Sequence, residues 1–459
     1  MVFSNLIFLY LFLPVCLIAY FFCPGIRAKN AVLILFSLIF YAWGEPVYLL
    51  LMIASAAVNW YFGLLIERRR KKIFLILALV LDLGCLAVFK YAGFFVENLN
   101  ALFRISLAVP QIPLPIGISF YTFQALSYTV DVWRGDVPAQ RSFAKLLLYI
   151  SLFPQLIAGP IVRYSDVAAQ IDDRQFDASE AFYGATRFCV GLAKKVLLAD
   201  AAGKVASQIL DGSLASSTTV AAWLGILLYT FEIYFDFSGY SDMAIGMGRI
   251  FGFKYMENFR LPYTAKSITD FWRRWHISLS SFFRDYVYIP LGGNRKGMLR
   301  TVFNLLLVWA VTGFWHGGGL HFILWGMILG LLVVIEKLWI GKWLKKSKIL
   351  SHVYVLFVIP LTWMVFAIPT LPEIGVYFAR LFPFFGVGSA VNPGDFAKEL
   401  TLFIPELVGG ILLCIPQVYR WCEKHRKNVI VVAALFVVFW YSVYRMANAA
   451  NNPFMYANF

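Results

Sequence analysis

Two histidines flank a run of three glycines between two apolar segments of the chain. They are His316 and His321, in the string Thr312-Gly-Phe-Trp-His-Gly-Gly-Gly-Leu-His. A neutral imidazole in apolar surroundings is a competent general base, because desolvation disfavours its charged form. Buried histidines are also common as hydrogen-bonded core residues, so residue type and spacing alone leave both roles open. His276 would add a third metal ligand, but no H-E-x-x-H or comparable spacing is present, and we predict no metal site.

The densest mixture of basic, aromatic and hydroxyl side chains lies between residues 267 and 295. The members of this stretch that could contact a substrate are Asp270, Trp272, Arg273, His276 and Arg284. Arginines at this density suit a phosphate-bearing ligand that arrives from the cytoplasm. The alternative is an amphipathic helix at the level of the lipid headgroups, which has the same mixture of Trp, Arg and Phe.

Two further places bring polar side chains into apolar segments, where they usually mark function. In residues 113–135, Pro and Gly break the helical start, and Ser119, Tyr121 and Gln124 follow. These three side chains predict either a polar tunnel wall or hydrogen bonds between helices. In residues 234–242, Asp236 is a second candidate for substrate binding, with a helix cap as the alternative.

The composition predicts an all-α polytopic membrane protein. Of the 459 residues 61% are apolar and 14% are charged, and the mean hydropathy is +0.73. A soluble domain is about one quarter charged. The net charge of +15 lies mostly in short loops between apolar runs, which is typical of cytoplasmic loops near anionic lipids rather than of nucleic-acid binding. We therefore expect membrane lipids, and no nucleic acid, as partners.

A spanning helix needs about 20 mostly apolar residues, and the sequence predicts roughly ten to twelve of them, with re-entrant or interfacial helices besides. The candidates are Val2–Phe22, Ala31–Ala42, Leu49–Ile66, Ile73–Phe89, Ile112–Val130, Leu146–Val162, Val220–Phe235, Val302–Phe314, Leu320–Ile335, Leu350–Ile368, Leu400–Ile415 and Val429–Tyr444.

The basic loops also predict an orientation. Placing residues 67–72, 294–300, 337–348 and 420–427 in the cytoplasm is consistent if the segment 181–199 does not cross, and it puts the N-terminus outside. No linker or composition shift divides the chain, so we expect one membrane domain over residues 1–459. An internal repeat, which is common in secondary transporters, is missing.

Several strings resemble, in the same order, the membrane-bound O-acyltransferases. The similarity is to the branch that holds the bacterial alginate O-acetyltransferase membrane subunit and the D-alanyl transferase of teichoic acid synthesis. The matching strings include Pro115-Ile-Gly-Ile-Ser-Phe-Tyr121, Tyr234-Phe-Asp-Phe-Ser-Gly-Tyr-Ser-Asp-Met-Ala244, Trp272-Arg-Arg-Trp-His-Ile-Ser-Leu-Ser280, Ile289-Pro-Leu-Gly-Gly-Asn-Arg295 and Phe314-Trp-His-Gly317. The resemblance covers residues 1 to about 335, and the expected C-terminal spans, about 350–446, carry no matched motif.

The resemblance implies a multi-helix membrane fold in which a cytoplasmic acyl donor and an extracytoplasmic acceptor meet. It places the family's two histidines at His316 and His276, both of which we predict to be catalytic. His316 would take the hydroxyl proton of the acceptor, and His276, with Asp270 and Arg273, would shape the donor side. The implied donor substrate is acetyl-CoA or another acyl thioester, with no permanently bound cofactor.

The implied setting is the bacterial cytoplasmic membrane, where an extracytoplasmic partner protein accepts the acyl group and completes transfer to an exported polysaccharide. Three alternatives stay open at this point: D-alanyl transfer in place of acetyl transfer, a transporter or flippase of an activated lipid or sugar, and a scaffold subunit of an export complex. The sequence identifies neither the acceptor glycan nor the groups that stabilise the oxyanion.

Overall fold

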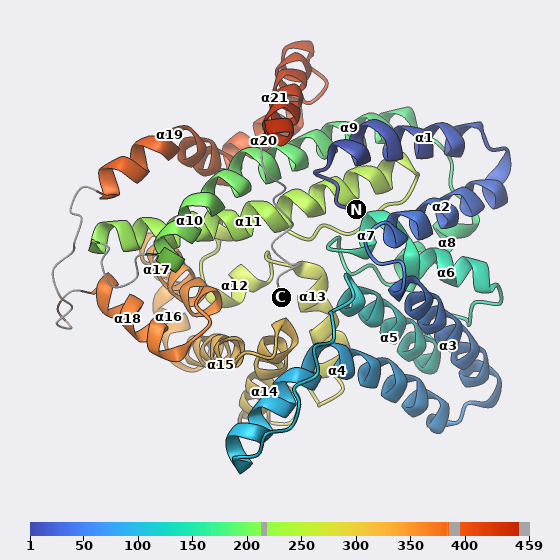
Figure 1. Cartoon of the computed structure of the whole chain (residues 1–459), viewed down its shortest axis with the longest axis horizontal. Helices are drawn as coiled ribbons and strands as arrows, with labels where there is room; N and C mark the ends of the chain where they lie inside the picture. The colour runs from blue at the N-terminus through green and yellow to red at the C-terminus, as the bar shows by residue number, and fades with distance from the viewer. Residues whose placement is uncertain (213–217, 383, 385–394, 449–459) are drawn as a thin grey trace. The chain divides into compact units, whose positions relative to one another are not determined.

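Helices are the regular elements of the described part of the chain. The computed structural model describes residues 1–212, 218–382, 384 and 395–448, and each regular element in them is a helix (Figure 1). In hydrocarbon, backbone N–H and C=O groups have no water to bond, so an apolar chain satisfies them inside helices. The predicted fold class, an all-α polytopic membrane protein, is confirmed.

Within the described residues, eight helices are long and apolar enough to cross a membrane. They are α2 (Gly25–Ala42), α3 (Tyr48–Arg69), α4 (Lys72–Phe103), α11 (Thr219–Ile250), α14 (Met298–His316), the stretch Leu320–Leu344, α17 (Lys348–Ala367) and α21 (Val429–Asn448). A ninth span results if Phe403–Cys414 and Pro416–His425, bent by 79°, count as one.

Backbone breaks explain why fewer helices reach spanning length than the ten to twelve apolar segments of the sequence. The segment 112–130 becomes helical only at α5 (Ile118–Arg134), because Gly117 before it is left-handed with φ of 76°. The segment 146–162 is broken at Leu152 into two short helices. Apolar composition alone therefore overstates the number of full spans.

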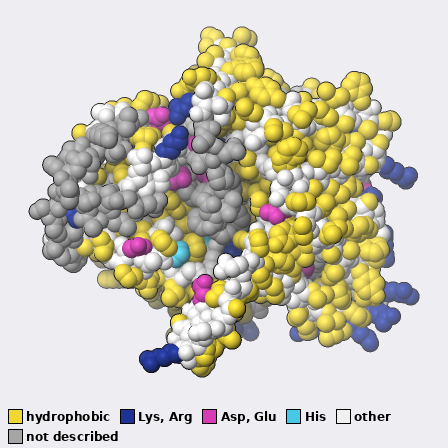
Figure 2. Space-filling view, viewed as in Figure 1, with side chains coloured by type: hydrophobic (Ala, Val, Ile, Leu, Met, Phe, Trp, Pro, Cys, Tyr) yellow, Lys and Arg dark blue, Asp and Glu magenta, His cyan; other side chains and the backbone are white. Residues whose placement is uncertain are grey.

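The surface is apolar, as lipid contact requires. Figure 2 shows hydrophobic side chains over most of the described surface on the face that it draws. Phe22, Leu299 and Val429 are 84%, 88% and 80% exposed. On a water-soluble protein a surface with so many large exposed hydrophobic side chains would cause association.

The described chain divides into two compact units, and the first comprises residues 1–188 and 240–257. Its helices are η1 (Phe8–Phe12), α1 (Leu13–Phe22), α2, α3, α4, α5, α6 (Phe143–Ser151), α7 (Phe153–Leu156), α8 (Tyr164–Asp172), most of α9 (Ala178–Ala193) and the end of α11. One buried arginine ties this unit together: Arg187 lies 2.8 Å from Asp242 and 2.5 Å from Glu257. Two carboxylates thus compensate a charge that would be costly to bury alone.

The second unit comprises residues 189–239 and 258–459. Its helices are η2 (Lys194–Ala199), α10 (Asp200–Gly212), most of α11, η3 (Pro262–Thr264), α12 (Ile268–Trp272), α13 (Ile277–Phe283), η4 (Arg284–Tyr288), α14, α15 (Leu320–Ile335), η5 (Glu336–Ile340), α16 (Gly341–Leu344), α17, α18 (Leu371–Leu381), α19 (Asp395–Cys414), α20 (Pro416–His425) and α21. The prediction of a single domain over the whole chain stays a prediction.

The hairpin of α14 and α15 is the closest helix pair of the second unit, and the two ribbons lie side by side in Figure 1. The helices touch through Gly313 and Gly326. A Cβ atom on Gly326 would lie 3.0 Å from the backbone N and Cα of Gly313 and would also meet the carbonyl oxygen of Trp309. Small residues let two helix backbones approach this closely in a membrane.

The glycine contact generates a stability prediction with a matched control. Gly326→Ala should lower the free energy of unfolding by about 1–3 kcal/mol, because the added methyl group forces the two backbones apart. Gly375→Ala, on α18 where no atom lies within 4 Å of the added Cβ, should be neutral or stabilising by up to about 1 kcal/mol. Thermal unfolding of both variants in the same detergent measures the difference. Equal melting temperatures for the two variants would contradict this account of the hairpin.

Candidate active site

A large cavity lies within the described residues of the second unit. Its volume is about 1450 Å³, and both His276 and His316 line it. Well-formed ligand pockets range from about 300 to 1,000 Å³, so the cavity has room for more than one small molecule. All its lining residues belong to residues 233–237 and 266–366.

His316 is the last residue of α14, where the helix ends at a glycine. Its imidazole contacts three aromatic rings from three elements: ring centroids lie 5.1 Å away for Trp325 of α15, 5.2 Å for Phe366 of α17 and 4.7 Å for Trp315. The first two contacts are edge-to-face, the geometry that aromatic quadrupoles favour. The ring is held in apolar surroundings, yet it still borders the cavity, so it is not sealed in side-chain packing.

Tryptophans form the wall beside His316. Trp325 lies 5.6 Å from Trp272 and 5.8 Å from Trp363, while Trp272 lies 5.0 Å from Trp309, all between ring centroids. These four indoles line the cavity together. Among the described residues, the buried indole N–H groups of Trp272 and Trp325 have no hydrogen-bond partner. Buried donors are nearly always paired, so two such groups at a cavity are available to a ligand.

His276 has a constrained backbone and a buried ring. Its φ of 43° and ψ of 56° are left-handed, a conformation that is uncommon for residues other than glycine. Asn258 holds the turn: its carbonyl accepts from the backbone N–H of Ile277 at 2.9 Å, and its side-chain oxygen accepts from the hydroxyl of Ser278 at 2.9 Å. The Ser278 hydroxyl in turn lies 3.4 Å from Nδ1 of His276. Burial lowers the pKa of His276 to about 4, so the imidazole is neutral at pH 7.

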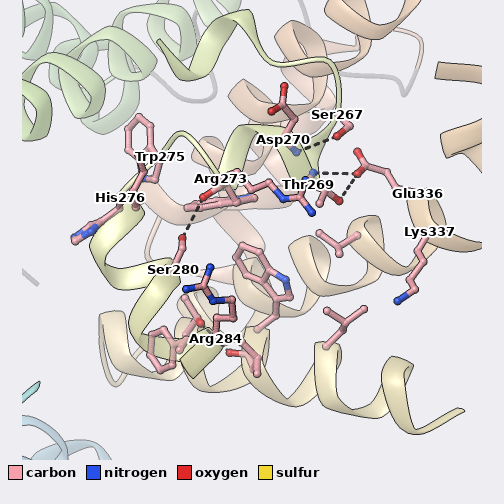
Figure 3. A pocket seen from close by; sticks show the side chains of 18 of the residues that line it. Ser267, Thr269, Asp270, Arg273, Trp275, His276, Ser280, Arg284, Glu336 and Lys337 are labelled. Atoms are coloured by element: carbon pink, nitrogen blue, oxygen red, sulfur yellow. Dashed lines mark hydrogen bonds between the residues drawn. The ribbon is translucent and has the colours of Figure 1, made fainter. Parts of the chain in front are cut away.

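The helix α12 presents Asp270, Trp272 and Arg273 to the same cavity. Ser267 caps its start by accepting from the backbone N–H of Asp270 at 2.9 Å. The carboxylate of Asp270 accepts from Nε of Arg274 at 3.0 Å. Figure 3 shows Ser267, Thr269, Asp270 and Glu336 at one end of the cavity, with Arg273 drawn toward its interior.

Positive charge dominates among the charged side chains of the cavity lining. The basic residues among the described lining are Lys266, Arg273, Arg284, Lys337, Lys342, Lys345 and Lys348. The carboxylates of the same lining are Asp270 and Glu336. Figure 3 shows Arg273, Arg284 and Lys337 reaching the cavity from three different elements. The geometry combines a basic region with an aromatic region that holds His316.

The structure brings six of the ten predicted site residues to this cavity. They are Asp270, Trp272, Arg273, His276, Arg284 and His316. Asp236 is buried elsewhere in the second unit, where its carboxylate lies 2.6 Å from Nζ of Lys195, which also lies 2.8 Å from Asp200. Ser119, Tyr121 and Gln124 are buried in α5 of the first unit and are not among the lining residues. The catalytic and binding roles of all ten stay predictions.

Several lining residues were not predicted from the sequence. Trp325, Trp363 and Phe366 lie in apolar spans, where they read as lipid-facing or core side chains. Glu336 and Lys337 follow an apolar span, so the sequence suggests only the charged end of a spanning helix at these two positions. The one available signal was Glu336, because an acidic residue beside a predicted cytoplasmic run of lysines breaks the charge pattern.

The described residues hold no group of three or more His, Cys, Asp or Glu side chains that could bind a metal ion. The cavity instead has the parts of a group-transfer site: a neutral imidazole able to accept a proton, unpaired N–H donors and a positive region for an anion.

Comparison with known proteins decides the family. The model of the MBOAT, membrane-bound O-acyltransferase family matches residues 74–371. The chain belongs to this family. The probable alginate O-acetylase AlgI of Azotobacter vinelandii is 43% identical over 394 residues, which are 84% of this chain and 78% of that protein. The peptidoglycan O-acetyltransferase of Helicobacter pylori is 37% identical over 373 residues, 73% of this chain and 70% of that protein.

A third MBOAT relative is more distant. The teichoic acid D-alanyltransferase of Bacillus subtilis is 29% identical over 243 residues, 51% of this chain and 61% of that protein. The predicted resemblance, including both named branches, is confirmed. The protein is thus a membrane-bound O-acyltransferase, and family membership favours bond chemistry over the transporter and scaffold alternatives.

The buried His276 generates a pH prediction. Because its pKa is lower in the folded protein, about 4, than the 6.5 of an exposed histidine, the unfolded chain takes up the proton first as the pH falls. The free energy of unfolding should therefore decrease as the pH falls from 6.5 toward 4, by about 2 kcal/mol at pH 5.

Thermal unfolding at several pH values in detergent tests this. His276→Asn, in which Asn tolerates the left-handed backbone, should show a smaller decrease between pH 7 and 5, while His425→Asn on α20 should match the parent. A slope unchanged in His276→Asn would contradict the assignment.

Proposed function

We propose that this MBOAT enzyme transfers acetyl groups from cytoplasmic acetyl-CoA, across a bacterial cytoplasmic membrane, toward an exported polysaccharide. His316 is the general base, and an extracytoplasmic partner protein accepts the acetyl group. The observation that carries the proposal is the cavity itself, in which His316 and His276 lie on one surface with a strongly basic region.

The proposed reaction begins with proton transfer to His316. The imidazole removes the proton from the acceptor hydroxyl as that oxygen attacks the thioester carbonyl carbon. A tetrahedral intermediate forms, its C–S bond breaks, and the departing sulfur takes the proton from the imidazolium. The products are an acetyl ester and free CoA thiol, so protons and electrons balance. The aromatic rings around His316 exclude water that would otherwise hydrolyse the thioester.

The intermediate carries a negative oxygen, which needs hydrogen-bond donors. Two candidate donors are the unpaired indole N–H group of Trp325, whose ring packs on His316, and that of Trp272, whose ring packs on Trp325. Loss of one donor of this kind typically lowers kcat by about 10²- to 10³-fold. Ser119, Tyr121 and Gln124, which the sequence predicted to form a polar tunnel wall or hydrogen bonds between helices, stay candidates for substrate contact.

The basic region suits the phosphates of CoA. Arg273 and Arg284 supply planar guanidinium groups, which bind phosphate through two hydrogen bonds, and lysines supply point charges. Lys337, Lys342 and Lys345 line the same region. His276 and Asp270 position this donor side. CoA is a substrate here, and no permanently bound cofactor is required.

The relatives favour acetyl as the acyl group and a polysaccharide as the final acceptor. The two relatives described above at 37% and 43% identity are named for acetyl transfer to alginate or peptidoglycan, and the D-alanyl relative is 29% identical. We propose an alginate-like exopolysaccharide as the final acceptor.

His316→Gln should lower acetyl transfer by about 10²- to 10⁴-fold, the usual contribution of a positioned base. Purified protein in detergent, supplied with labelled acetyl-CoA and its partner protein, measures the rate. His321→Gln, on the neighbouring span, is the matched control and should lose far less activity. Unchanged turnover in a folded His316→Gln variant would rule out His316 as the base. If the parent protein uses an aminoacyl donor but not acetyl-CoA, the result would favour D-alanyl transfer.

Arg273→Ala should raise the KM for acetyl-CoA by about tenfold or more, since hydrogen bonds to charged groups contribute about 1.5–3 kcal/mol, and should change kcat less. Arg300→Ala is the control, because Arg300 packs over Phe303 and is not a lining residue. The KM of the parent should also rise with salt. Equal KM values for the two variants would remove Arg273 from the donor site.

A further inference from the structure

One carboxylate faces a cavity that is otherwise positive, and it is fully engaged by hydrogen bonds. Glu336, the first residue of η5, is 6% exposed. Its carboxylate accepts from the backbone N–H groups of Ile268 and Thr269, the latter at 3.0 Å, and from the hydroxyl of Thr269 at 2.7 Å.

These bonds satisfy the start of α12. The first N–H groups of any helix lack partners within the helix, and the N-terminus carries partial positive charge. Ser267 satisfies the N–H of Asp270, and Glu336 satisfies the two before it. A helix of five residues has little stability of its own, so its position depends on such contacts. Figure 3 shows Glu336 reaching Thr269 from the neighbouring helix.

The helix α12 carries the residues on which the proposed donor site depends. Trp272 and Arg273 follow Thr269 within one turn and line the cavity. Glu336 itself continues the α15 helix that contributes Trp325, the ring against His316. The carboxylate of Glu336 therefore connects α12, which carries the proposed acyl-donor site, to α15, which packs on the proposed base His316.

We propose that Glu336 is the positioning residue of this enzyme, fixing α12 so that Trp272 and Arg273 meet the acyl donor in register with His316. This rests on the proposed function of the cavity. The acidic group is tolerated beside an anion-binding region because its oxygens face the α12 N-terminus, which compensates the charge. Glu336 acts through α12 and moves no proton.

Three variants of this contact separate positioning from catalysis. Glu336→Ala removes every bond to α12 and should raise the KM for acetyl-CoA by about 10- to 100-fold, with a smaller change in kcat. Glu336→Gln keeps one acceptor oxygen and should restore much of the loss. Thr269→Val removes only the hydroxyl bond and should fall between Glu336→Gln and the parent. Glu373→Ala, which removes a carboxylate that accepts from the hydroxyl of Thr370, the N-cap residue of α18, is the matched control and should leave both constants unchanged.

Two outcomes would overturn the proposal. If Glu336→Gln lowers kcat by about 10²- to 10⁴-fold and shifts its pH profile, Glu336 moves a proton. If Glu336→Ala matches Glu373→Ala in the KM for acetyl-CoA, α12 does not depend on the carboxylate.

A measurement without turnover keeps this test separate from the proposed function. Hydrogen exchange of the peptide 267–274 should be faster in Glu336→Ala than in Glu373→Ala, because two backbone N–H groups lose their acceptor. Binding of CoA itself, measured by calorimetry on detergent-purified protein, should weaken in Glu336→Ala alone. If the parent protein binds no CoA, the proposed function is wrong. If the parent binds CoA, and the two variants have equal hydrogen-exchange rates and equal affinities for CoA, only the proposed role of Glu336 is wrong.

Discussion

The backbone contact between Gly313 and Gly326 is the constraint from which the site follows. It brings α14 and α15 so close that no Cβ atom fits between them. The short glycine turn then leaves His316 at the very end of α14, with its ring on Trp325, one residue before Gly326. Tryptophan could not pack there across a wider gap without leaving a void, which would cost stability. The glycines thus set the distance between α14 and α15, and the aromatic rings set the orientation of the His316 imidazole.

The chemistry proposed for the cavity needs two kinds of surroundings that oppose each other. A neutral imidazole requires apolar neighbours, whereas a phosphate-bearing ligand requires fixed positive charge. The lining of one cavity supplies both, with tryptophans of which Trp325 packs on His316, and with basic residues such as Arg284 and Lys337. The helix α12 joins the two parts, because Trp272 belongs to the aromatic wall and Arg273 next to it belongs to the basic region.

The features that could be predicted from the sequence are those carried by local motifs. Both histidines and the residues of α12 stood in recognisable strings, and they do share one cavity. The rest depends on contacts between distant residues. Glu336 bonds to Ile268 across 68 positions, and Phe366 reaches His316 from another helix. Span lengths were overestimated because apolar composition does not reveal a backbone break such as the left-handed Gly117. Asp236 pairs with Lys195, a contact between two helices that the sequence alone does not reveal.

The lysines between residues 337 and 348 connect topology with the proposed chemistry. Such a run is typical of cytoplasmic loops, and four of its lysines, Lys337, Lys342, Lys345 and Lys348, line the cavity. The orientation predicted from this charge pattern would place the basic lining on the cytoplasmic side, where the proposed donor acetyl-CoA is made. The proposed donor would need no separate entrance, because lysines of η5, α16 and the start of α17 already belong to the lining of the cavity. In the proposed mechanism the two substrates meet at the imidazole of His316, the last residue of the spanning helix α14.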